Sequence, residues 1–360
     1  MNVVERDYLN QVLPFYQCSL NNCTVSSLGN GLINQTFLVR NINSSFVLQR
    51  INHHVFKQPE QVINNAELIN KHLQEKKEQA QYPLEPMWQI TAKHDSPLVV
   101  VDDDNYWRAI QFIPNCFTVE AVDTPEQAKQ VATAFGQFTS ALSDFPASQL
   151  DEIIPNFHNL DFRLAQLKQV VAEDPVNRLA QCQKLVDFCF EQENFINKVA
   201  ELVDTLPVQV THNDTKINNL LFNSETEKPI AVIDLDTCMP GFIMHDFGDM
   251  VRTCCSNLPE DGTDLAKMKV RLDIFEALSS AYIESFNGNI TQLEQQSLIV
   301  GAQLLPFMIG IRFLTDFIDG DNYFQTKHSL HNLERAKNQL HLFKSLNTIE
   351  ETLSTIILSS

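Results

Sequence analysis

A run of eight mostly polar residues, set between two short apolar segments, constrains this chain more than any other feature. Residues 208–211 (VQVT) favour an extended strand, residues 212–219 (HNDTKINN) are polar except for Ile217, and residues 220–222 (LLF) favour a strand again. This order predicts a polar loop that ends on a strand. Its side chains would face a cleft while its backbone is held rigidly, so the octet is the first candidate for a functional site.

The octet supplies ligands for a cation and charges for a phosphoryl group. Asp214 offers a carboxylate, Asn219 offers an amide oxygen, and Lys216 could place an ammonium at a transferring phosphoryl group. Asp234 follows fifteen residues after Asn219, at the end of the apolar segment 230–233. If segments 220–222 and 230–233 are adjacent strands, Asn219 and Asp234 come within reach of one Mg²⁺, which prefers oxygen ligands. Such a site would bridge nucleotide phosphates.

The order of strand and helix patterns divides the chain in two. Residues 1–20 suggest a helix, and strands are predicted at 24–28, 35–41, 44–51, 96–107 and 108–115, with a helix at 59–79. Further helices are predicted at 125–145, 162–173, 178–205, 264–288, 291–318 and 327–345. The sequence thus predicts an α+β fold with a small N-lobe (1–114) of antiparallel sheet plus helix and a larger, mainly helical C-lobe (115–360).

Composition and the apolar segments bear on compartment and partners. The formal net charge is -19, from 26 Lys and Arg against 45 Asp and Glu, which disfavours nucleic acid as a partner. The apolar run 298–311 is too short to span a bilayer and contains Gln303 and Pro306, so we predict a buried helix and no membrane partner. The first ten residues lack the apolar segment of a signal peptide, which indicates the cytoplasm. The eight cysteines form no C-x-x-C pair and are expected to be free thiols.

The pattern H-x-D-x-x-x-x-N at 212–219, followed by Ile-Asp at 233–234, resembles the aminoglycoside phosphotransferase and choline kinase group of the protein-kinase-like fold. The resemblance extends in order along nearly the whole chain. It implies a kinase that uses ATP and Mg²⁺, with a nucleotide-binding N-lobe. Asp214 would accept or orient the acceptor hydroxyl, and His212 would brace the loop. Asn219 and Asp234 would hold Mg²⁺.

The N-lobe would contribute a phosphate loop and an adenine contact. The segment 29–34 (GNGLIN) lies between two predicted strands and fits a loop over ATP phosphates, with Gly31 and Asn34 as contacts. The segment that contains Gln111 and Ile113 would offer backbone groups to adenine.

The resemblance also implies a phosphate-binding lysine on the third strand, and here the chain departs from the pattern. Gln49 occupies that position, and Arg50 lies beside it on the opposite strand face. Either Arg50 takes over through a change of register, or the phosphates are contacted differently. Glu67 on the following helix would be the usual partner of the lysine, or else it is a solvated helix carboxylate.

Two further carboxylates need assignment. The string Asp246-Phe247-Gly248 looks like the metal-binding D-F-G of protein kinases, but it follows no strand. In choline-kinase-like families a similar segment opens a helix and supports the catalytic loop, so we assign that supporting role to Asp246. Asp236 is either an accessory metal ligand or a solvated loop carboxylate.

The acceptor is suggested by three longer strings, VLQRINHHVFKQPE, THNDTKINN and IDLDTCMPGFIMHDFGD, which are most similar to the N-acetylhexosamine 1-kinase branch of the group. This resemblance implies transfer to the anomeric hydroxyl of GlcNAc or GalNAc, with Arg312, Tyr323 and Arg252 at the sugar. Arginine can donate directed hydrogen bonds to sugar oxygens. A kinase for choline, homoserine or an aminoglycoside remains an alternative, and so does a pseudokinase that only binds its ligands.

Overall fold

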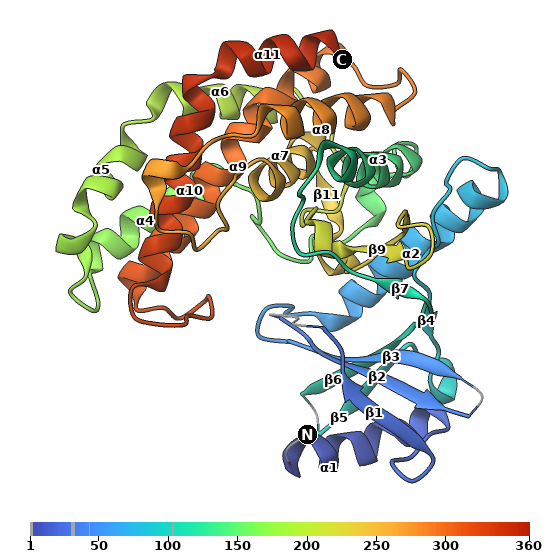
Figure 1. The fold of residues 1–360 in the computed structure, drawn as a ribbon. Coiled ribbons are helices and arrows are strands. Elements are labelled where there is room, and N and C mark those ends of the chain that lie inside the picture. Colours follow the sequence, from blue (N-terminus) through green and yellow to red (C-terminus); the bar gives the residue numbers. More distant parts are fainter. Residues whose placement is uncertain (1–2, 30–32, 43, 103) are drawn as a thin grey trace. The chain divides into compact units, whose positions relative to one another are not determined.

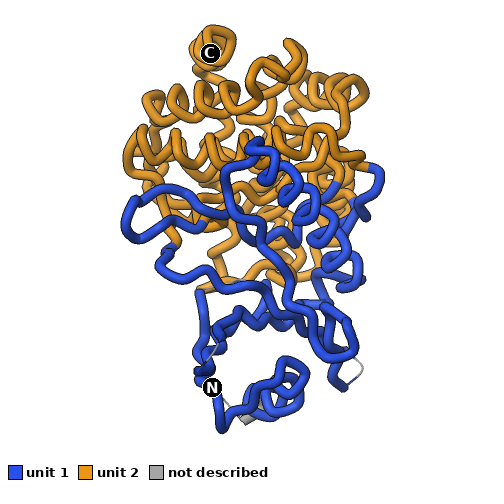
Figure 2. Tube along the Cα trace, turned by 90° about the vertical axis from the view of Figure 1, so that its right-hand side faces the viewer, with its two compact units in different colours: residues 1–117, 148–155, 221–239 blue, residues 118–147, 156–220, 240–360 orange. Residues whose placement is uncertain are grey.

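We describe a computed structural model of the chain, in which residues 3–29, 33–42, 44–102 and 104–360 are described. The chain divides into two compact units (Figure 2). Unit 1 comprises residues 1–117, 148–155 and 221–239, and unit 2 comprises residues 118–147, 156–220 and 240–360. The predicted lobe boundary at residue 114 stays a prediction.

Unit 1 is built on an antiparallel sheet in the order β1-β2-β3-β6-β4, with β5 also paired to β6 (Figure 1). The strands are β1 (Cys23–Ser27), β2 (Gln35–Asn41), β3 (Ser45–Ile51), β4 (Gln89–Ile90), β5 (Leu98–Val101) and β6 (Asn105–Gln111). The first three confirm the predicted strands. The predicted division of residues 96–115 was wrong, because the chain turns between β5 and β6, where Asp102 has a φ of 51° and its carbonyl accepts from the Asp104 N–H.

Helices cover both faces of this sheet, because successive side chains of each strand point to opposite faces. Helix α1 (Val3–Val12) and the short helix η1 (Leu13–Tyr16) pack on Phe46, Leu48 and Trp107. Residues Gln49 and Ile51 point to the other face because successive strand residues alternate. On that side Ile51 packs with Val62 and Ile63 of α2 (Pro59–Glu78), which confirms the predicted helix at 59–79. A second sheet of unit 1 has the order β10-β9-β7, from β7 (Cys116–Phe117), β9 (Leu220–Asn223) and β10 (Pro229–Val232).

Unit 2 is mainly helical and is organised around α9 (Gln292–Asp319), which packs against α4, α7, α10 and α11 (Figure 1). The other helices are α3 (Pro125–Ala141), α4 (Leu160–Glu173), α5 (Gln183–Phe190), α6 (Glu193–Val203), α7 (Ile243–Cys254), α8 (Leu272–Glu284), α10 (His331–Thr348) and α11 (Glu350–Ser359). The single helix predicted at 178–205 was wrong, because the chain breaks at residues 191–192 into α5 and α6. The antiparallel sheet in one unit and the helices in the other confirm the predicted α+β fold class.

Helix α9 begins at a capping box, in which Thr291 and Glu294 satisfy each other's backbone N–H groups. It ends at Gly320, whose φ of 102° suits a glycine. By length and hydropathy alone α9 could cross a membrane, but 83% of its most apolar window is buried inside the protein. This confirms the buried helix predicted at 298–311. All eight cysteines are free, as expected.

Candidate active site

The polar octet folds as a loop between β8 (Gln209–Thr211) and the short helix η5 (Ile217–Asn219), and Asp246 anchors it. The carboxylate of Asp246, in the first turn of α7, accepts the backbone N–H groups of His212 at 2.9 Å and Asn213 at 2.7 Å. The hydroxyl of Thr215 donates to the Asp246 carbonyl at 2.6 Å. Burial raises the pKa of Asp246 to about 7, although the two backbone hydrogen bonds lower it. Asp246 therefore fixes the loop backbone.

His212 supports the same loop from its other side. Its ring is completely buried and makes edge contacts with Phe135 and Phe138, at centroid distances of 5.4 and 5.8 Å. Its Nδ1 accepts the backbone N–H of Asp214 at 3.3 Å. The imidazole thus fixes the backbone of Asp214, and its location fits the bracing role predicted for it.

Asp214 lies at the centre of a small polar cluster. Its Oδ1 is 2.6 Å from the ammonium of Lys216, and its Oδ2 and carbonyl oxygen accept from the Asn219 amide at 3.0 and 2.8 Å. Burial would raise the pKa of Asp214, but Lys216 and His212 outweigh burial, and the pKa is lowered. An ionised carboxylate of this kind can orient a hydroxyl and accept its proton.

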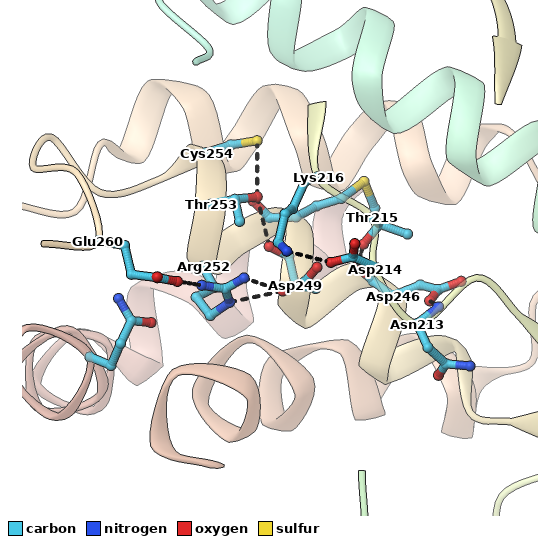
Figure 3. A network of polar contacts seen from close by, with 12 residues as sticks. Asn213, Asp214, Thr215, Lys216, Asp246, Asp249, Arg252, Thr253, Cys254 and Glu260 are labelled. Atoms are coloured by element: carbon cyan, nitrogen blue, oxygen red, sulfur yellow. Dashed lines mark hydrogen bonds and ion pairs between the residues drawn. The ribbon is translucent and has the colours of Figure 1, made fainter. Parts of the chain in front are cut away.

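A separate set of ion pairs lies beside this cluster and includes Asp249 and Arg252 of α7 (Figure 3). Arg252 donates from Nε and NH2 to Oδ1 of Asp249, both at 2.8 Å, and from NH1 to Glu260 at 2.6 Å. Arg335 on α10 donates to the other oxygen of Glu260 at 2.6 Å. Arg252, predicted to contact a sugar, therefore directs its guanidinium at two carboxylates of its own chain.

Arg312 and Tyr323, also predicted at the acceptor, lie together. The guanidinium NH2 of Arg312 is 3.4 Å from the Tyr323 hydroxyl and lies over the rings of Phe157, Tyr323 and Phe324, at 5.2 to 5.5 Å from their centroids. Among the described residues Arg312 forms no ion pair with a carboxylate. Tyr323 is 57% exposed, so an aromatic ring and a guanidinium are presented together at the end of α9.

In unit 1 a second polar network links β3 and β6 to the segment that follows β10. Arg108 stands opposite Gln49 in the β3–β6 register and donates to its Oε1 at 2.9 and 2.7 Å. The same guanidinium is 2.5 Å from Oδ1 of Asp236, whose Oδ2 accepts from Asn34 at 2.7 Å. Asp236 is 1% exposed. It is therefore not a solvated carboxylate, and the role of an accessory metal ligand stays a prediction.

The two alternatives left open around Gln49 are decided in part by side-chain direction. Arg50 points to the α1 face, where it lies 4.8 Å from the Tyr8 ring centroid and hydrogen-bonds Asn105. The β3–β6 register runs without a shift, with Gln49 opposite Arg108 and Arg50 opposite Trp107, so Arg50 stays on the face opposite to Gln49. Glu67 is exposed on α2 and forms no ion pair within the described part of the chain.

The remaining predicted residues are placed only locally. Asp234 is exposed, with a left-handed φ of 61°, and it directly precedes the short helix η6 (Leu235–Thr237). The backbone N–H of Gln111 donates to the Trp88 carbonyl at 2.8 Å, and the carbonyl of Ile113 accepts from the Cys116 thiol at 2.9 Å. Gly31 lies outside the described residues. The shared magnesium of Asn219 and Asp234, and the adenine contacts, stay predictions.

Comparison with known proteins decides the family. A family model described as a phosphotransferase enzyme family matches residues 24–278, well over half of the chain. The chain belongs to this phosphotransferase family. This confirms the resemblance to the aminoglycoside phosphotransferase and choline kinase group, and it makes the chain a small-molecule phosphotransferase.

Solved structures share the fold of this phosphotransferase at low sequence identity. An aminoglycoside phosphotransferase from Alicyclobacillus acidocaldarius is 15% identical, with a TM-score of 0.63 over 94% of this chain and 95% of that chain. A choline kinase from Cryptosporidium parvum Iowa II is 14% identical, with a TM-score of 0.57 over 99% of each chain. A spectinomycin phosphotransferase in complex with ADP and spectinomycin is 11% identical, with a TM-score of 0.55 over 96% and 98%.

Three polar residues of this phosphotransferase were missed by sequence reasoning: Arg108, Asp249 and Glu260. Arg108 interrupts the apolar stretch 106–110 within β6, and an arginine that is 2% exposed must be paired. Asp249 directly follows Gly248 in the amphipathic helix α7 and is also buried. Charges within apolar patterns were therefore the available signal, whereas Glu260 lies in a loop where no pattern marks it.

Proposed function

We propose that this phosphotransferase is a kinase that transfers the terminal phosphoryl group of ATP to a hydroxyl of a neutral sugar, most specifically the anomeric hydroxyl of an N-acetylhexosamine. The observation that carries the proposal is the pairing of Asp214 with Lys216 on a loop anchored by Asp246. An anchored carboxylate beside a cation suits phosphoryl transfer, which depends on positioning and charge neutralisation. We expect the enzyme to work in the cytoplasm.

Each residue of the loop has a role in this proposal. Asp214 orients the acceptor hydroxyl and accepts its proton. Lys216 neutralises charge that develops on the transferred group. Burial opposes the charged form of Lys216, but Asp214 and Asp249 outweigh burial and raise its pKa, so the ammonium stays charged. A charged donor in a partly desolvated site stabilises a phosphoryl oxygen strongly.

The donors needed for Mg²⁺ are present on Asn219 and Asp234. The amide nitrogen of Asn219 is committed to Asp214, so its oxygen is the atom left to face a cation. Asp234 is an exposed carboxylate, and both are hard oxygen ligands. When bound, Mg²⁺ would neutralise charge on the nucleotide phosphates.

We also propose Arg108 as the cation that serves the phosphates in place of the expected lysine. It is directly opposite Gln49, on the same sheet face, whereas Arg50 points to α1. In this proposal the positive charge that the missing lysine at position 49 would supply comes from a residue on the neighbouring strand. It also weakens the pseudokinase alternative, which rested on the missing lysine.

Charge in unit 2 favours a neutral acceptor over a cationic one. Arg163 and Arg312 form no ion pair with any carboxylate in the described residues. Burial, together with Arg312, lowers the pKa of Arg163 to about 10, so the two guanidinium groups act on each other. A quaternary or primary ammonium would be repelled by this pair, whereas a sugar or acetamide oxygen would accept from it.

ATP consumption with a panel of acceptors tests the proposal. Turnover on GlcNAc or GalNAc, with the 1-phosphate identified by NMR, is the expected result. Turnover on choline, homoserine or an aminoglycoside, with the sugars inactive, would instead select the amino alcohol alternative. Tight ATP binding with no transfer to any acceptor would favour the pseudokinase.

A further inference from the structure

One oxygen of Asp249 has no partner although the side chain is buried. Asp249 is on α7 and is only 3% exposed. Its Oδ1 accepts both Nε and NH2 of Arg252 at 2.8 Å. No described residue donates a hydrogen bond to its Oδ2. A buried carboxylate oxygen without a donor is costly, so this atom is suited to accept a hydrogen bond from a molecule outside the chain.

The position of Asp249 connects it to the transfer centre. It lies between Arg252 and the Lys216–Asp214 pair (Figure 3). Asp249 raises the pKa of Lys216, whose ammonium is 2.6 Å from Asp214. A molecule whose reacting hydroxyl meets Asp214 therefore brings its neighbouring groups towards Asp249.

The orientation of the Asp249 carboxylate is fixed by the groups behind it. Arg252 is held by Glu260 at 2.6 Å, and Glu260 is held in turn by Arg335 at 2.6 Å. The loop that carries Glu260 is tied to α10, because the amide of Asn338 donates to the carbonyls of Pro259 and Gly262 at 3.0 and 2.8 Å. A donor group of a ligand would thus meet a preorganised acceptor.

We propose that Asp249 accepts a hydrogen bond from a second hydroxyl of the acceptor, and so makes the enzyme specific for polyhydroxylated, uncharged molecules. The inference rests on the proposed function. A hydroxyl suits this oxygen better than an ammonium does, because Lys216 and Arg252 already neutralise the carboxylate from two sides. Asp249 would then select the acceptor, while Asp214 acts on the hydroxyl that reacts.

The test combines Asp249→Asn with acceptors that each lack one hydroxyl. With Oδ1 still facing Arg252, the asparagine places an NH₂ donor where Oδ2 was, which reverses the hydrogen bond. The wild type should lose roughly ten- to hundred-fold in kcat/KM with one of 3-deoxy, 4-deoxy or 6-deoxy GlcNAc. Asp249→Asn should lose about as much with GlcNAc itself, and nothing further with that same analogue. The KM for ATP should not change.

Glu294→Gln is the matched control, because Glu294 is also 3% exposed in unit 2 but is fully engaged with Thr291 and Gln209. It should leave the discrimination between GlcNAc and its deoxy analogues unchanged. Calorimetric titration with GlcNAc gives a readout that does not need turnover, and Asp249→Asn should bind it roughly ten-fold or more weakly.

The outcomes separate the two hypotheses. If GlcNAc is turned over and Asp249→Asn lowers kcat/KM by the same factor with GlcNAc and with every deoxy analogue, Oδ2 accepts no hydroxyl of the acceptor. In that case the inference is wrong, while the proposed function stands. If the wild type acts on amines and binds no sugar, both are wrong. If GlcNAc binds without transfer, equal affinity of wild type and Asp249→Asn would likewise overturn the inference.

Discussion

The guanidinium of Arg108 lies 2.5 Å from Oδ1 of Asp236, and both side chains are almost completely buried in unit 1. Asp236→Asn leaves Arg108 buried beside a neutral partner. Because breaking a buried pair uncovers an uncompensated charge, the free energy of unfolding should fall by about 3–5 kcal/mol. Chemical denaturation of wild type and variant measures this loss.

The double variant Arg108→Met, Asp236→Leu separates stability from nucleotide binding. Replacing both charges should restore most of the stability, since apolar pairs often substitute for buried ion pairs. If Arg108 serves the phosphates, the KM for ATP should still rise about ten-fold or more in the stable double variant. A normal KM for ATP there would show that Arg108 is only structural.

Gly248, the last residue of the D-F-G string, is a packing residue. A Cβ at this position would lie 2.1 Å from the carbonyl oxygen of Gly301 on α9. Gly248→Ala should gain helix propensity but force α7 and α9 apart, so we expect a net loss of about 2–3 kcal/mol. Thermal unfolding measures it. Lys168→Ala, at an exposed position of α4, is the control and should leave the melting temperature within a degree or two of the wild type.

The sequence predicted the helices and strands whose apolar residues recur with a clear period. It missed the boundaries that are set by tertiary packing. The strands at 35–41 and 44–51 and the helix at 59–79 have clear periodicity and were placed within one or two residues. The break at residues 191–192 has no glycine or proline to mark it, and α11 was not predicted at all. The apolar pattern of a segment does not show where contacts with distant residues end a helix.

The same limit applies to the site. Asp214, Lys216 and Asn219 are close in sequence, so the motif predicted that they would lie together, and in unit 2 they do. The partner of Gln49 could not be predicted, because Arg108 reaches it only through the β3–β6 register, across 59 residues of chain. The members of a hydrogen-bond network between distant segments can be identified only once the fold is known.

Asp214→Ala tests the centre of the mechanism. Removing the carboxylate that orients the hydroxyl should lower kcat by about a thousand-fold. Nucleotide should still bind, because the proposed phosphate contacts are elsewhere. Kinetics with GlcNAc and calorimetry with an ATP analogue provide the two readouts. Asp161→Ala, on the exposed start of α4, should change neither; loss of nucleotide binding in Asp214→Ala would place this carboxylate at the metal instead.

Asp234→Ala and Asp246→Ala should fail in different ways. The first removes the proposed metal ligand, so the Mg²⁺ concentration for half-maximal rate should rise about ten-fold or more, together with a lower kcat. The second removes the anchor of His212 and Asn213, so it should lower stability and kcat with little change in the Mg²⁺ requirement. A selective rise in the Mg²⁺ requirement of Asp246→Ala would mean that Asp246 is the metal ligand.

Glu260 should contribute to stability in a pH-dependent way. Burial would raise its pKa, but Arg252 and Arg335 outweigh burial and lower the pKa from 4.5 to about 2. A depressed pKa stabilises the folded state above pH 4.5, and this stabilisation is lost as the pH falls towards 2. Because a third of the side chain is exposed, solvent screening reduces the contribution to about 1–2 kcal/mol.

Glu260→Gln should therefore flatten the stability profile between pH 4.5 and pH 2, where the wild type loses the contribution of Glu260. Urea denaturation at a series of pH values measures the difference between the two proteins. Glu201→Gln, at an exposed position of α6, should follow the wild-type profile throughout. If Glu260→Gln also followed it, the ion pairs with Arg252 and Arg335 would contribute nothing to stability, and the fixed orientation of Asp249 would need another source.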